Sequence, residues 1–389
     1  MKIGIITVHN GQNYGASLQA YALVKKLRNM GFDAYLVDYR TKKIEERLSS
    51  YRRKEKYNSF SNILKNLRSE CSELLFDTSE YLKLVTERFE EFHQLILDVN
   101  SGEYHACDEM RILNKEYDAF ICGSDQIWNP NITDLDDSFF LRFADESSKR
   151  VAYAPSLGMR SDSVSKEMEG ELKEKLQHIQ YLSIREENNK NLIERLTERY
   201  CQTVLDPVLL LEKDGWQDLL NSADNVCPRE PYAFYYPVIE QPELEKFAMQ
   251  ESRKRGWKLV NPRLVPKYAK VKGYTEVPKS IVGPAEFLKL LVESEAVFTN
   301  SFHATVFSSI YGKELYIIPL KGRHLSRNNR IFEYLKKIKL ADVEIGNDCS
   351  LVHVEKRHFE TVELVLERER KRSLEYLLDL SLIHISEPT

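Results

Sequence analysis

The chain has 389 residues, of which 42% are hydrophobic and 30% charged, and its formal net charge is -4. This length exceeds what one ordinary domain needs, so we expect two domains that share a cleft. The composition is that of a globular protein, the balanced charge gives no indication of nucleic-acid binding, and no apolar stretch is long enough to span a bilayer.

Cysteine usage and the opening residues both indicate a cytoplasmic location. The cysteines lack C-x-x-C spacing, which argues against a zinc site and a disulfide framework and favours reduced thiols. The opening stretch MKIGIITVHNG has a short apolar run, which predicts a first β-strand and not a signal peptide. The six cysteines are Cys71, Cys107, Cys122, Cys201, Cys227 and Cys349.

The first 40 residues predict a strand, a helix and a second strand. KIGIITV and DAYLVDY have strand patterns, and LQAYALVKKLRNM between them has helical spacing and ends before Gly31. From about residue 41 to 110 the sequence is highly charged and helical, which predicts an insert that lies over or beside the first domain. Its basic cluster at residues 52–56, interleaved with tyrosines, favours a solvated helix face over a nucleic-acid or membrane patch.

Strand and helix patterns then alternate, which predicts mostly parallel sheets with helices on both faces. The strand patterns in this part are YDAFIC, RVAYAPSLG, YLSIREE and QTVLDPVLLL. The turn-rich segment NSADNVCPREP separates a first domain, residues 1–228, from a second with the same plan, residues 229–353. A single long helix over residues 354–380 follows. The last residues, 381–389, abandon its charge pattern, and we interpret them as a foreign tail.

In open α/β sheets, ligands bind beyond the carboxyl ends of the strands, so the loops there hold the candidate site residues. The first such loop, HNGQNYGAS, contains Asn13, Tyr14 and Gly15. It matches neither the dinucleotide nor the nucleoside-triphosphate glycine motif, which disfavours both chemistries. The loop GSDQIWNP contributes a second set, for which an Asx turn with an aromatic plug is an equal alternative. That set is Ser124, Asp125, Gln126 and Trp128.

Two further loops supply positive charge. Arg185 ends a predicted strand, and its forked guanidinium suits a carboxylate, although a surface ion pair with Glu186 or Glu187 would also explain it. In VFTNSFHATVFSSIYGKE, Asn300 or Ser301 is the natural N-cap of a helix. The cap places His303 in the first helical turn.

Free backbone N–H groups and the helix dipole favour an anion beside His303, although a packing or capping role is commoner for a single histidine. Basic residues follow the next strand. Together these groups predict a seat for a small dianion between the domains, with no metal, because no acidic cluster has a histidine partner. The basic residues after that strand are Lys321, Arg323, His324, Arg327 and Arg330.

Five segments carry a family resemblance. They occur in the order and spacing of the polysaccharide pyruvyl transferases, which the chain resembles from its first strand to about Leu340. The resemblance implies an α/β fold with two Rossmann-like domains facing a cleft, similar to the GT-B glycosyltransferases. The segments are NYGASLQAYAL, DAFICGSDQIWNP, LSIREEN, VLDPVLLL and TNSFHATVFSSIYGKE.

The resemblance also implies the reaction. Phosphoenolpyruvate would be the donor substrate, with no cofactor, and a cell-surface glycan or a lipid-linked saccharide would be the acceptor. The product is a pyruvate ketal on the sugar, and phosphate is released. A peripheral association with the inner face of the membrane is compatible with such an acceptor, and no nucleic-acid partner is expected.

The family's residues can be carried over where its motifs match. Its arginine in S-x-R-[DE] falls on Arg185, and its histidine at the strand-to-helix turn falls on His303. A basic residue after the next strand best matches Lys321. The family's alternative R-L-H turn is replaced by NSFH here, so Arg323 or Arg330 is expected to supply the missing charge.

We therefore predict two catalytic residues, His303 and Asp125, and a larger set that binds substrate. Asp206 is a second candidate for the hydroxyl base, although it precedes Pro207 and is equally suited to form a turn. Two rival functions remain: a glycosyltransferase that uses a nucleotide sugar, and a non-catalytic scaffold of a glycan assembly complex. The predicted substrate-binding residues are Asn13, Tyr14, Gly15, Ser124, Gln126, Trp128, Arg185, Asn300, Ser301, Lys321, Arg323 and Arg330.

Overall fold

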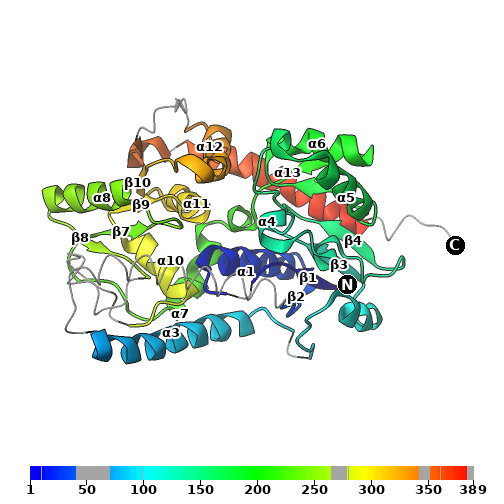
Figure 1. Ribbon diagram of the computed structural model, residues 1–389, viewed down its shortest axis with the longest axis horizontal. Coiled ribbons are helices and arrows are strands. Elements are labelled where there is room, and N and C mark those ends of the chain that lie inside the picture. Colours follow the sequence, from blue (N-terminus) through cyan, green and yellow to red (C-terminus); the bar gives the residue numbers. More distant parts are fainter. Residues whose placement is uncertain are drawn as a thin grey trace.

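The computed structural model describes residues 1–9, 11–40, 71–98, 100–263, 278, 280–340, 351–359 and 361–382. The basic cluster at residues 52–56 and most of the predicted foreign tail lie outside the described residues. Figure 1 shows the chain folded around two sheets, with the first on the side of the N-terminus and the second on the opposite side.

The first sheet is parallel throughout, with strand order β2-β1-β3-β4. A short parallel pair, β5 and β6, continues it through an isolated bridge between Val151 and Tyr181. The strands are β1 (Lys2–Ile6), β2 (Asp33–Leu36), β3 (Ala119–Cys122), β4 (Lys149–Ala152), β5 (Ser183–Ile184) and β6 (Gln202–Thr203). The helices of this half are α1 (Tyr14–Asn29), α3 (Cys71–Gln94), α4 (Pro130–Thr133), α5 (Lys166–Leu176), α6 (Glu187–Thr197) and α7 (Gln217–Ser222).

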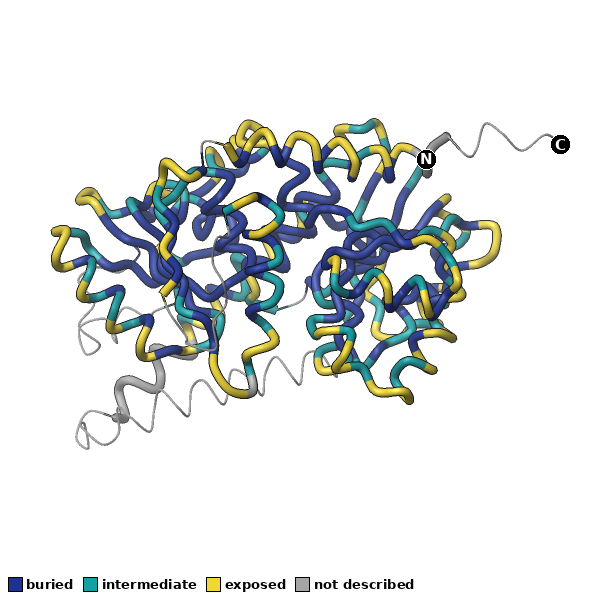
Figure 2. Tube along the Cα trace, turned by 90° about the horizontal axis from the view of Figure 1, so that it is seen from above, coloured by how far each residue is buried: buried dark blue, intermediate teal, exposed yellow. Residues whose placement is uncertain are grey.

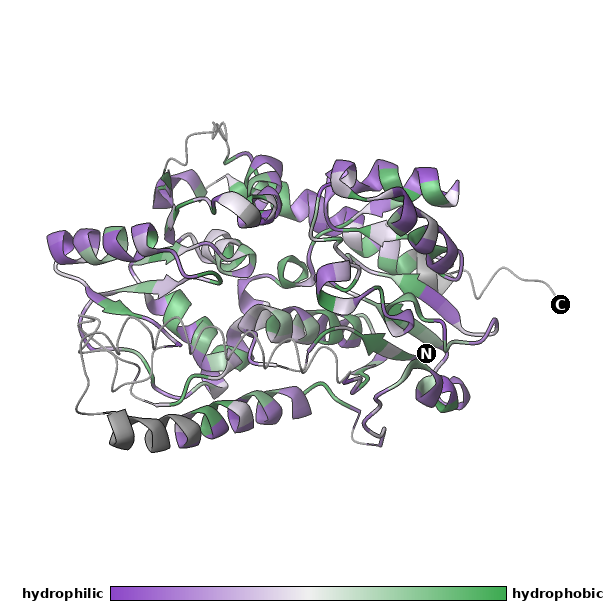
Figure 3. Cartoon of the chain, in the orientation of Figure 1, coloured by the Kyte–Doolittle hydropathy of each residue, from purple (hydrophilic) through white to green (hydrophobic). Residues whose placement is uncertain are grey.

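The second sheet has the order β11-β10-β9-β7-β8, and all of its pairs are parallel except β10 with β11. Helix α8, largely hydrophilic in Figure 3, begins with a proline and ends at Gly256, as expected for an exposed helix of this type. The strands are β7 (Tyr232–Tyr236), β8 (Lys258–Val260), β9 (Ala296–Thr299), β10 (Glu314–Ile317) and β11 (Val352–Val354). The helices are α8 (Pro242–Arg255), α10 (Pro284–Glu293), α11 (Phe302–Tyr311), α12 (Asn328–Lys337) and α13 (Val362–Leu382).

One hydrophobic cluster runs through both halves of the molecule. It contains Ile5 of β1, Val208 of the 3-10 helix η4 (Pro207–Leu210) and Phe234 of β7, and the buried strands and inner helices form a continuous band in Figure 2. At its centre the ring of Tyr14 stacks on Phe287 with 4.4 Å between centroids. The two sheets are therefore joined by packed apolar surface, which holds the ends of their strands in a defined relation.

The described part of the charged insert packs on both halves. Helix α3 contacts α1 and α10, and it runs along the lower side of the molecule in Figure 1. Its buried face carries Val85, Phe89 and Phe92. His93 of this helix exchanges a 3.0 Å hydrogen bond with Ser17, and burial lowers the pKa of His93 to about 3. The helix therefore buries a neutral histidine together with its apolar face.

Two sequence predictions of secondary structure are wrong. The final helix begins at Val362 and not at residue 354, because Val352 and Val354 alternate with a polar residue and pair with β10 as an antiparallel edge strand. The apolar run VLDPVLLL is not a strand beyond Thr203. Asp206 caps η4 by accepting a hydrogen bond from the backbone N–H of Val208 at 3.1 Å.

Helix α13 returns to the first half and anchors the segment that leads into η4. Ser373 Oγ accepts a 3.0 Å hydrogen bond from the backbone N–H of Leu205, and Arg370 Nε donates one of 2.7 Å to the carbonyl of Leu209. Tyr376 donates to the carbonyl of Ala152 at 3.0 Å.

Among the described residues, no helix has both the length and the apolar character that crossing a bilayer would require.

We predict that Ser373→Ala destabilises the protein by about 1 to 3 kcal/mol, because the buried N–H of Leu205 loses its acceptor. Denaturant unfolding followed by circular dichroism measures this change. The exposed Ser147 provides the control, and Ser147→Ala should leave the free energy of unfolding within about 0.5 kcal/mol of the parent. Equal stability of the two variants would mean that α13 does not anchor this segment.

Candidate active site

The loop after β3 is held rigidly at the carboxyl edge of the first sheet. The backbone N–H of Ser124 donates to Gln19 Oε1 at 3.2 Å, and Ser124 Oγ donates to the carbonyl of Ala154 at 2.7 Å. Asp125 has a φ of 61°, a left-handed conformation that aspartate tolerates better than most residues. Its carbonyl accepts from the N–H of Ser156 at 2.8 Å. These contacts fix the direction of the Asp125 carboxylate.

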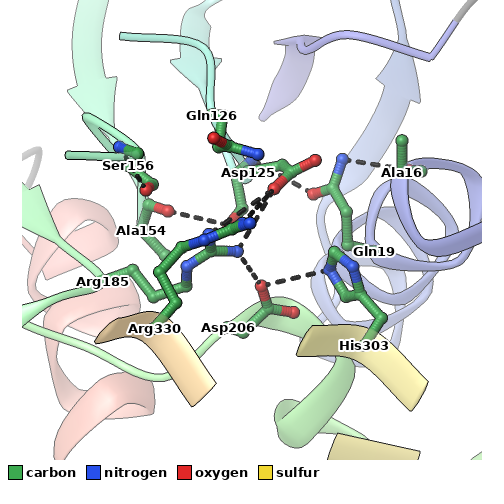
Figure 4. Close-up of polar contacts among 12 residues, drawn as sticks. Ala16, Gln19, Asp125, Gln126, Ala154, Ser156, Arg185, Asp206, His303 and Arg330 are labelled. Atoms are coloured by element: carbon green, nitrogen blue, oxygen red, sulfur yellow. Dashed lines mark hydrogen bonds and ion pairs between the residues drawn. The ribbon is translucent and has the colours of Figure 1, made fainter. Parts of the chain in front are cut away.

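Arg185, directly after β5, is the centre of a buried ion cluster (Figure 4). Its side chain is only 4% exposed. It donates to Asp206 at 2.7 Å and to Glu186 at 2.9 Å, and lies 3.5 Å from Asp125. Although burial lowers the pKa of Arg185, the charges of these carboxylates hold it above its ordinary value. The surface ion pair considered from the sequence is therefore a buried one with three partners.

Asp206 connects the cluster to the second half of the chain. One carboxylate oxygen caps η4, and the other accepts from Arg185 and lies 3.5 Å from His303 Nε2. Burial raises the pKa of Asp206, but the contacts with His303 and Arg185 lower it by more than burial raises it. The pKa of Asp206 therefore lies well below the usual range for aspartate. A carboxylate that resists protonation is a poor proton acceptor. Its position instead suits it to orient the imidazole.

His303 lies in the first turn of α11, as the sequence predicts. Ser301 is the N-cap and accepts a 3.4 Å hydrogen bond from the backbone N–H of Ala304, and the helix ends at Gly312 with a φ of 63°. The His303 side chain is 9% exposed, and its Nε2 has no hydrogen-bond partner among the described residues. Apart from the 3.5 Å contact with Asp206, the nitrogen has no partner among the described residues, so it can also receive a hydrogen bond from a bound ligand.

Gly15 allows α1 to approach the imidazole. A Cβ atom added at Gly15 would lie 2.3 Å from His303 Nδ1, closer than any real contact. The first turn of α1 therefore packs directly against the histidine ring. This contact explains why the segment NYGAS needs glycine at that position, and it brings the N-termini of α1 and α11 to the same place.

Arg330 reaches the same cluster from α12. Its Nη1 lies 3.8 Å from Asp125 Oδ1, and its guanidinium carbon lies 5.9 Å from the ring centroid of Phe302, which also faces Arg185 at 4.5 Å. Burial and the charge of Arg185 lower the pKa of Arg330 to about 10. Its Nε is buried without a partner among the described residues. Two crowded guanidinium groups with a spare donor favour the binding of an anion.

Sequence reasoning missed Glu333, which follows Arg330 by one helical turn. Burial and the charge of Glu186 raise the pKa of Glu333 to about 7. The Oε2 atoms of Glu186 and Glu333 are both buried without a hydrogen bond among the described residues. A carboxyl group that is partly protonated at neutral pH can donate a proton. The available signal was the i, i+3 spacing from Arg330, which becomes informative only once Arg330 is known to point into the site.

The structure brings together Asp125, Arg185, His303, Arg330 and Gly15, with Ser124 behind them. Other predicted site residues have structural partners. Trp128 is buried, stacks on Phe140 and donates from Nε1 to the carbonyl of Phe139.

The remaining predicted residues support the backbone or lie outside the cluster. Asn300 accepts from the N–H of Val238 at 2.7 Å and donates to the carbonyl of Ile239, so it fixes the loop after β7. Gln126 accepts from Asn129 Nδ2 at 2.8 Å. The other four have these positions: Asn13 is exposed and caps α1, Tyr14 packs on Phe287, Lys321 is exposed, and Arg323 has only its backbone described, in η6 (Gly322–Arg327).

Comparisons with known proteins bear on the family and the fold of the chain. The family model of polysaccharide pyruvyl transferase matches residues 13–321. A search of curated proteins found no match. Among solved structures, the chain is similar to a Listeria monocytogenes protein assigned as a UDP-N-acetylglucosamine 2-epimerase, with a TM-score of 0.53 and 11% identity over 100% of this chain and 97% of that chain.

A second similar structure is the UDP-GlcNAc 2-epimerase from Neisseria meningitidis bound to UDP-GlcNAc, with a TM-score of 0.45 and 12% identity over 97% of this chain and 100% of that chain. At identities this low, the Listeria structure, whose TM-score exceeds 0.5, supports the fold only, and the Neisseria structure carries no argument. Neither structure bears on the activity of this chain. Together with the two mainly parallel sheets, the Listeria structure confirms the predicted fold class, an α/β fold of two Rossmann-like domains like that of the GT-B enzymes.

We predict that Asp206→Asn lowers the free energy of unfolding at pH 7 by about 3 to 5 kcal/mol, because it removes one partner of a buried ion pair. The ionised Asp206 stabilises the fold fully above the pKa of an unfolded aspartate, about 3.9. That contribution is lost as the pH falls through the lower folded-state pKa. The difference between parent and variant should therefore shrink below pH 4.

Denaturant unfolding at a series of pH values measures this difference. Asp218, exposed and paired with Lys25 at the surface, provides the control, and Asp218→Asn should change stability little at any pH. A parent–variant difference that is small at pH 7, or that does not vary with pH, would contradict the depressed pKa of Asp206.

Proposed function

The chain belongs to the polysaccharide pyruvyl transferase family, and from this premise we propose that it moves pyruvate from phosphoenolpyruvate onto two hydroxyl groups of one sugar. The acceptor is a cell-surface polysaccharide or its precursor. The observation that best supports this proposal is the convergence of Arg185, Arg330 and His303, from both halves of the chain, around Asp125 and Asp206.

The donor carries a carboxylate and a phosphate, so the protein needs two anion-binding sites to hold it. Arg185 and Arg330 contact Asp125 only at 3.5 and 3.8 Å, longer than a strong charged hydrogen bond. A donor carboxylate or phosphate would offer these guanidinium groups a closer partner. The N-terminus of α11, where His303 lies, supplies the second anion-binding site through its backbone N–H groups.

The reaction requires two proton transfers and balances without any other reagent. A proton adds to the methylene carbon of the donor, which becomes a methyl group, and a sugar oxygen bonds to the neighbouring carbon. The bond from that carbon to the phosphate oxygen then breaks, and a second sugar oxygen takes its place. Of the two hydroxyl protons, one replaces the proton given to the methyl group and one leaves with phosphate.

Two side chains suit these transfers, His303 in the cluster and Glu333 one helical turn along α12 from Arg330. Glu333, with a pKa of about 7, can hold the proton that is given to the methylene carbon. His303 Nε2, which makes no hydrogen bond among the described residues, can accept a hydroxyl proton and pass it to the departing phosphate, while Asp206 at 3.5 Å stabilises the imidazolium that forms. Asp125 then serves to hold the two arginines in place until the donor binds.

The test of the function is an assay that follows consumption of phosphoenolpyruvate and release of phosphate in the presence of extracted glycan acceptors. Mass spectrometry of the glycan should reveal one added pyruvate for each phosphate released. A glycosyltransferase would instead consume a nucleotide sugar and leave phosphoenolpyruvate unchanged. Turnover with nucleotide sugars alone would overturn the proposal.

We predict that His303→Gln lowers turnover by about 100-fold or more, because glutamine can donate a hydrogen bond but cannot transfer a proton. The fold should be retained, since the only polar contact of Nε2 among the described residues is the 3.5 Å approach to Asp206, which is too long for a strong hydrogen bond and which a glutamine of similar volume can keep. The exposed His358 provides the matched control, and His358→Gln should keep parental turnover. If both variants were equally active, His303 would have a packing role only.

We predict that Gly15→Ala also abolishes most of the turnover, because the new methyl group would occupy the space of the His303 ring and displace it. Steady-state kinetics of the purified variant measures the loss. Gly170 of α5 is the matched control, since no atom lies within 4 Å of an added Cβ there. Gly170→Ala should leave turnover unchanged, and activity of Gly15→Ala close to that of this control would show that the ring can move without consequence.

A further inference from the structure

A cavity of about 200 Å³ lies between α6, α12 and α13, apart from the His303 cluster. We propose that it binds the phosphate or diphosphate group of a ring-bearing ester, such as a sugar phosphate. Its walls come from both halves of the chain, and Figure 1 shows the three helices along the same side of the molecule. The binding of this ligand does not rest on the pyruvyl transfer proposed above.

The charges that line the cavity are unbalanced in favour of an anion. Two lysines and two arginines face two glutamates. A single buried carboxylate, Glu369, is shared by Lys337 at 3.9 Å, Arg368 at 3.6 Å and Arg372 at 3.5 Å. None of these distances is that of a strong charged hydrogen bond. The cations therefore keep donors that a ligand with several anionic oxygens can satisfy.

Lys337 experiences the imbalance directly. Its pKa is lowered by burial, and the neighbouring Arg372 lowers it further, whereas Glu369 and Glu187 raise it. A bound anion would relieve both the desolvation and the repulsion between cations. The cavity is too small for a whole drug-sized ligand, which needs about 300 Å³ or more, but it can hold a phosphate group or two.

The rest of the ligand has a surface on which to lie. The ring of Tyr200 borders the cavity, is 69% exposed and faces the ammonium group of Lys190 at 5.2 Å. Thr203 Oγ1 in the wall is buried without a hydrogen-bond partner among the described residues. An exposed aromatic face beside positive charge is suited to a flat or ring-shaped group that carries an anion.

The cavity also bears on the geometry of the candidate active site. Lys337 lies on the same face of α12 as Arg330 and Glu333, at i+7 and i+4 from them. Helix α6, which carries Lys190, begins one residue after Glu186. A ligand that bridges Lys190 and Lys337 would therefore hold together the two helices that position the arginine pair.

Isothermal titration with inorganic pyrophosphate at constant ionic strength tests the site, with sulfate and chloride as competitors because exposed charges are screened by any salt. The double variant Arg368→Gln with Arg372→Gln removes two exposed cations of the cavity. We expect it to weaken pyrophosphate binding at least tenfold. The exposed Arg111, remote from the cavity, is the control, and Arg111→Gln should bind as the parent does.

A second control separates the cavity from the candidate active site. Arg330→Gln should retain pyrophosphate binding at the cavity, whereas loss of all binding in that variant would assign the anion to the His303 cluster and overturn the proposal. Equal binding by the parent and the double variant would overturn the proposal as well. So would an equal weakening of pyrophosphate binding by chloride and by sulfate at the same ionic strength, because that is the effect of screening alone. These outcomes do not depend on whether the protein consumes phosphoenolpyruvate.

The ring of the ligand is tested with glucose 1-phosphate, uridine diphosphate and inorganic phosphate. Tyr200→Ala should weaken at least one of the two ring-bearing ligands severalfold and leave inorganic phosphate unchanged, and whichever ester is affected identifies the ring as a sugar or a nucleoside. Unchanged binding of both esters by Tyr200→Ala would refute the part assigned to the aromatic face.

Discussion

The buried ion pair between Arg185 and Asp206, 2.7 Å apart, is the interaction on which the organisation of the site depends. Burying either charge without the other would cost several kcal/mol, so the fold must keep the two side chains in contact. The pair joins the end of β5 to the segment that leads into η4, and Asp206 extends it to His303 of α11. Electrostatic contacts thus fix the position of the two halves of the chain relative to each other, in addition to their shared apolar core.

Asp206 and Gly15 show that distant parts of the chain support the position of these charged side chains. Asp206 is held by its cap on η4, and the backbone just before it is held in turn by Ser373 of the last helix. Gly15 lets α1 close on the imidazole, while Tyr14 beside it packs against the second half. Neighbouring residues of one helix turn therefore serve packing and function separately, because successive side chains of a helix point in different directions.

The sequence predicted the two sheets and several helix limits because those features depend on local chemistry. Pro242 and Gly256 bound α8, and Ser301 and Gly312 bound α11. It could not predict β11, since a short edge strand forms only against β10. Nor could it separate Trp128, a core residue, from Asp125 in the same loop. That distinction depends on which side chains the tertiary fold turns inward, and the same limit concealed Glu333.

Helix α12 links the two charged regions of the structure by its periodicity. Its apolar face packs through Ile331 and Leu335, which leaves Arg330, Glu333 and Lys337 on an adjoining face. Arg330 and Lys337 each have their pKa lowered by burial, whereas Glu333 between them has its pKa raised by burial. All three shifts have the same origin, because a charge here is separated from water without full compensation. A helix with this pattern stores electrostatic cost, and an anion bound beside Arg330 or Lys337 would relieve the share of that cost that these two cations bear.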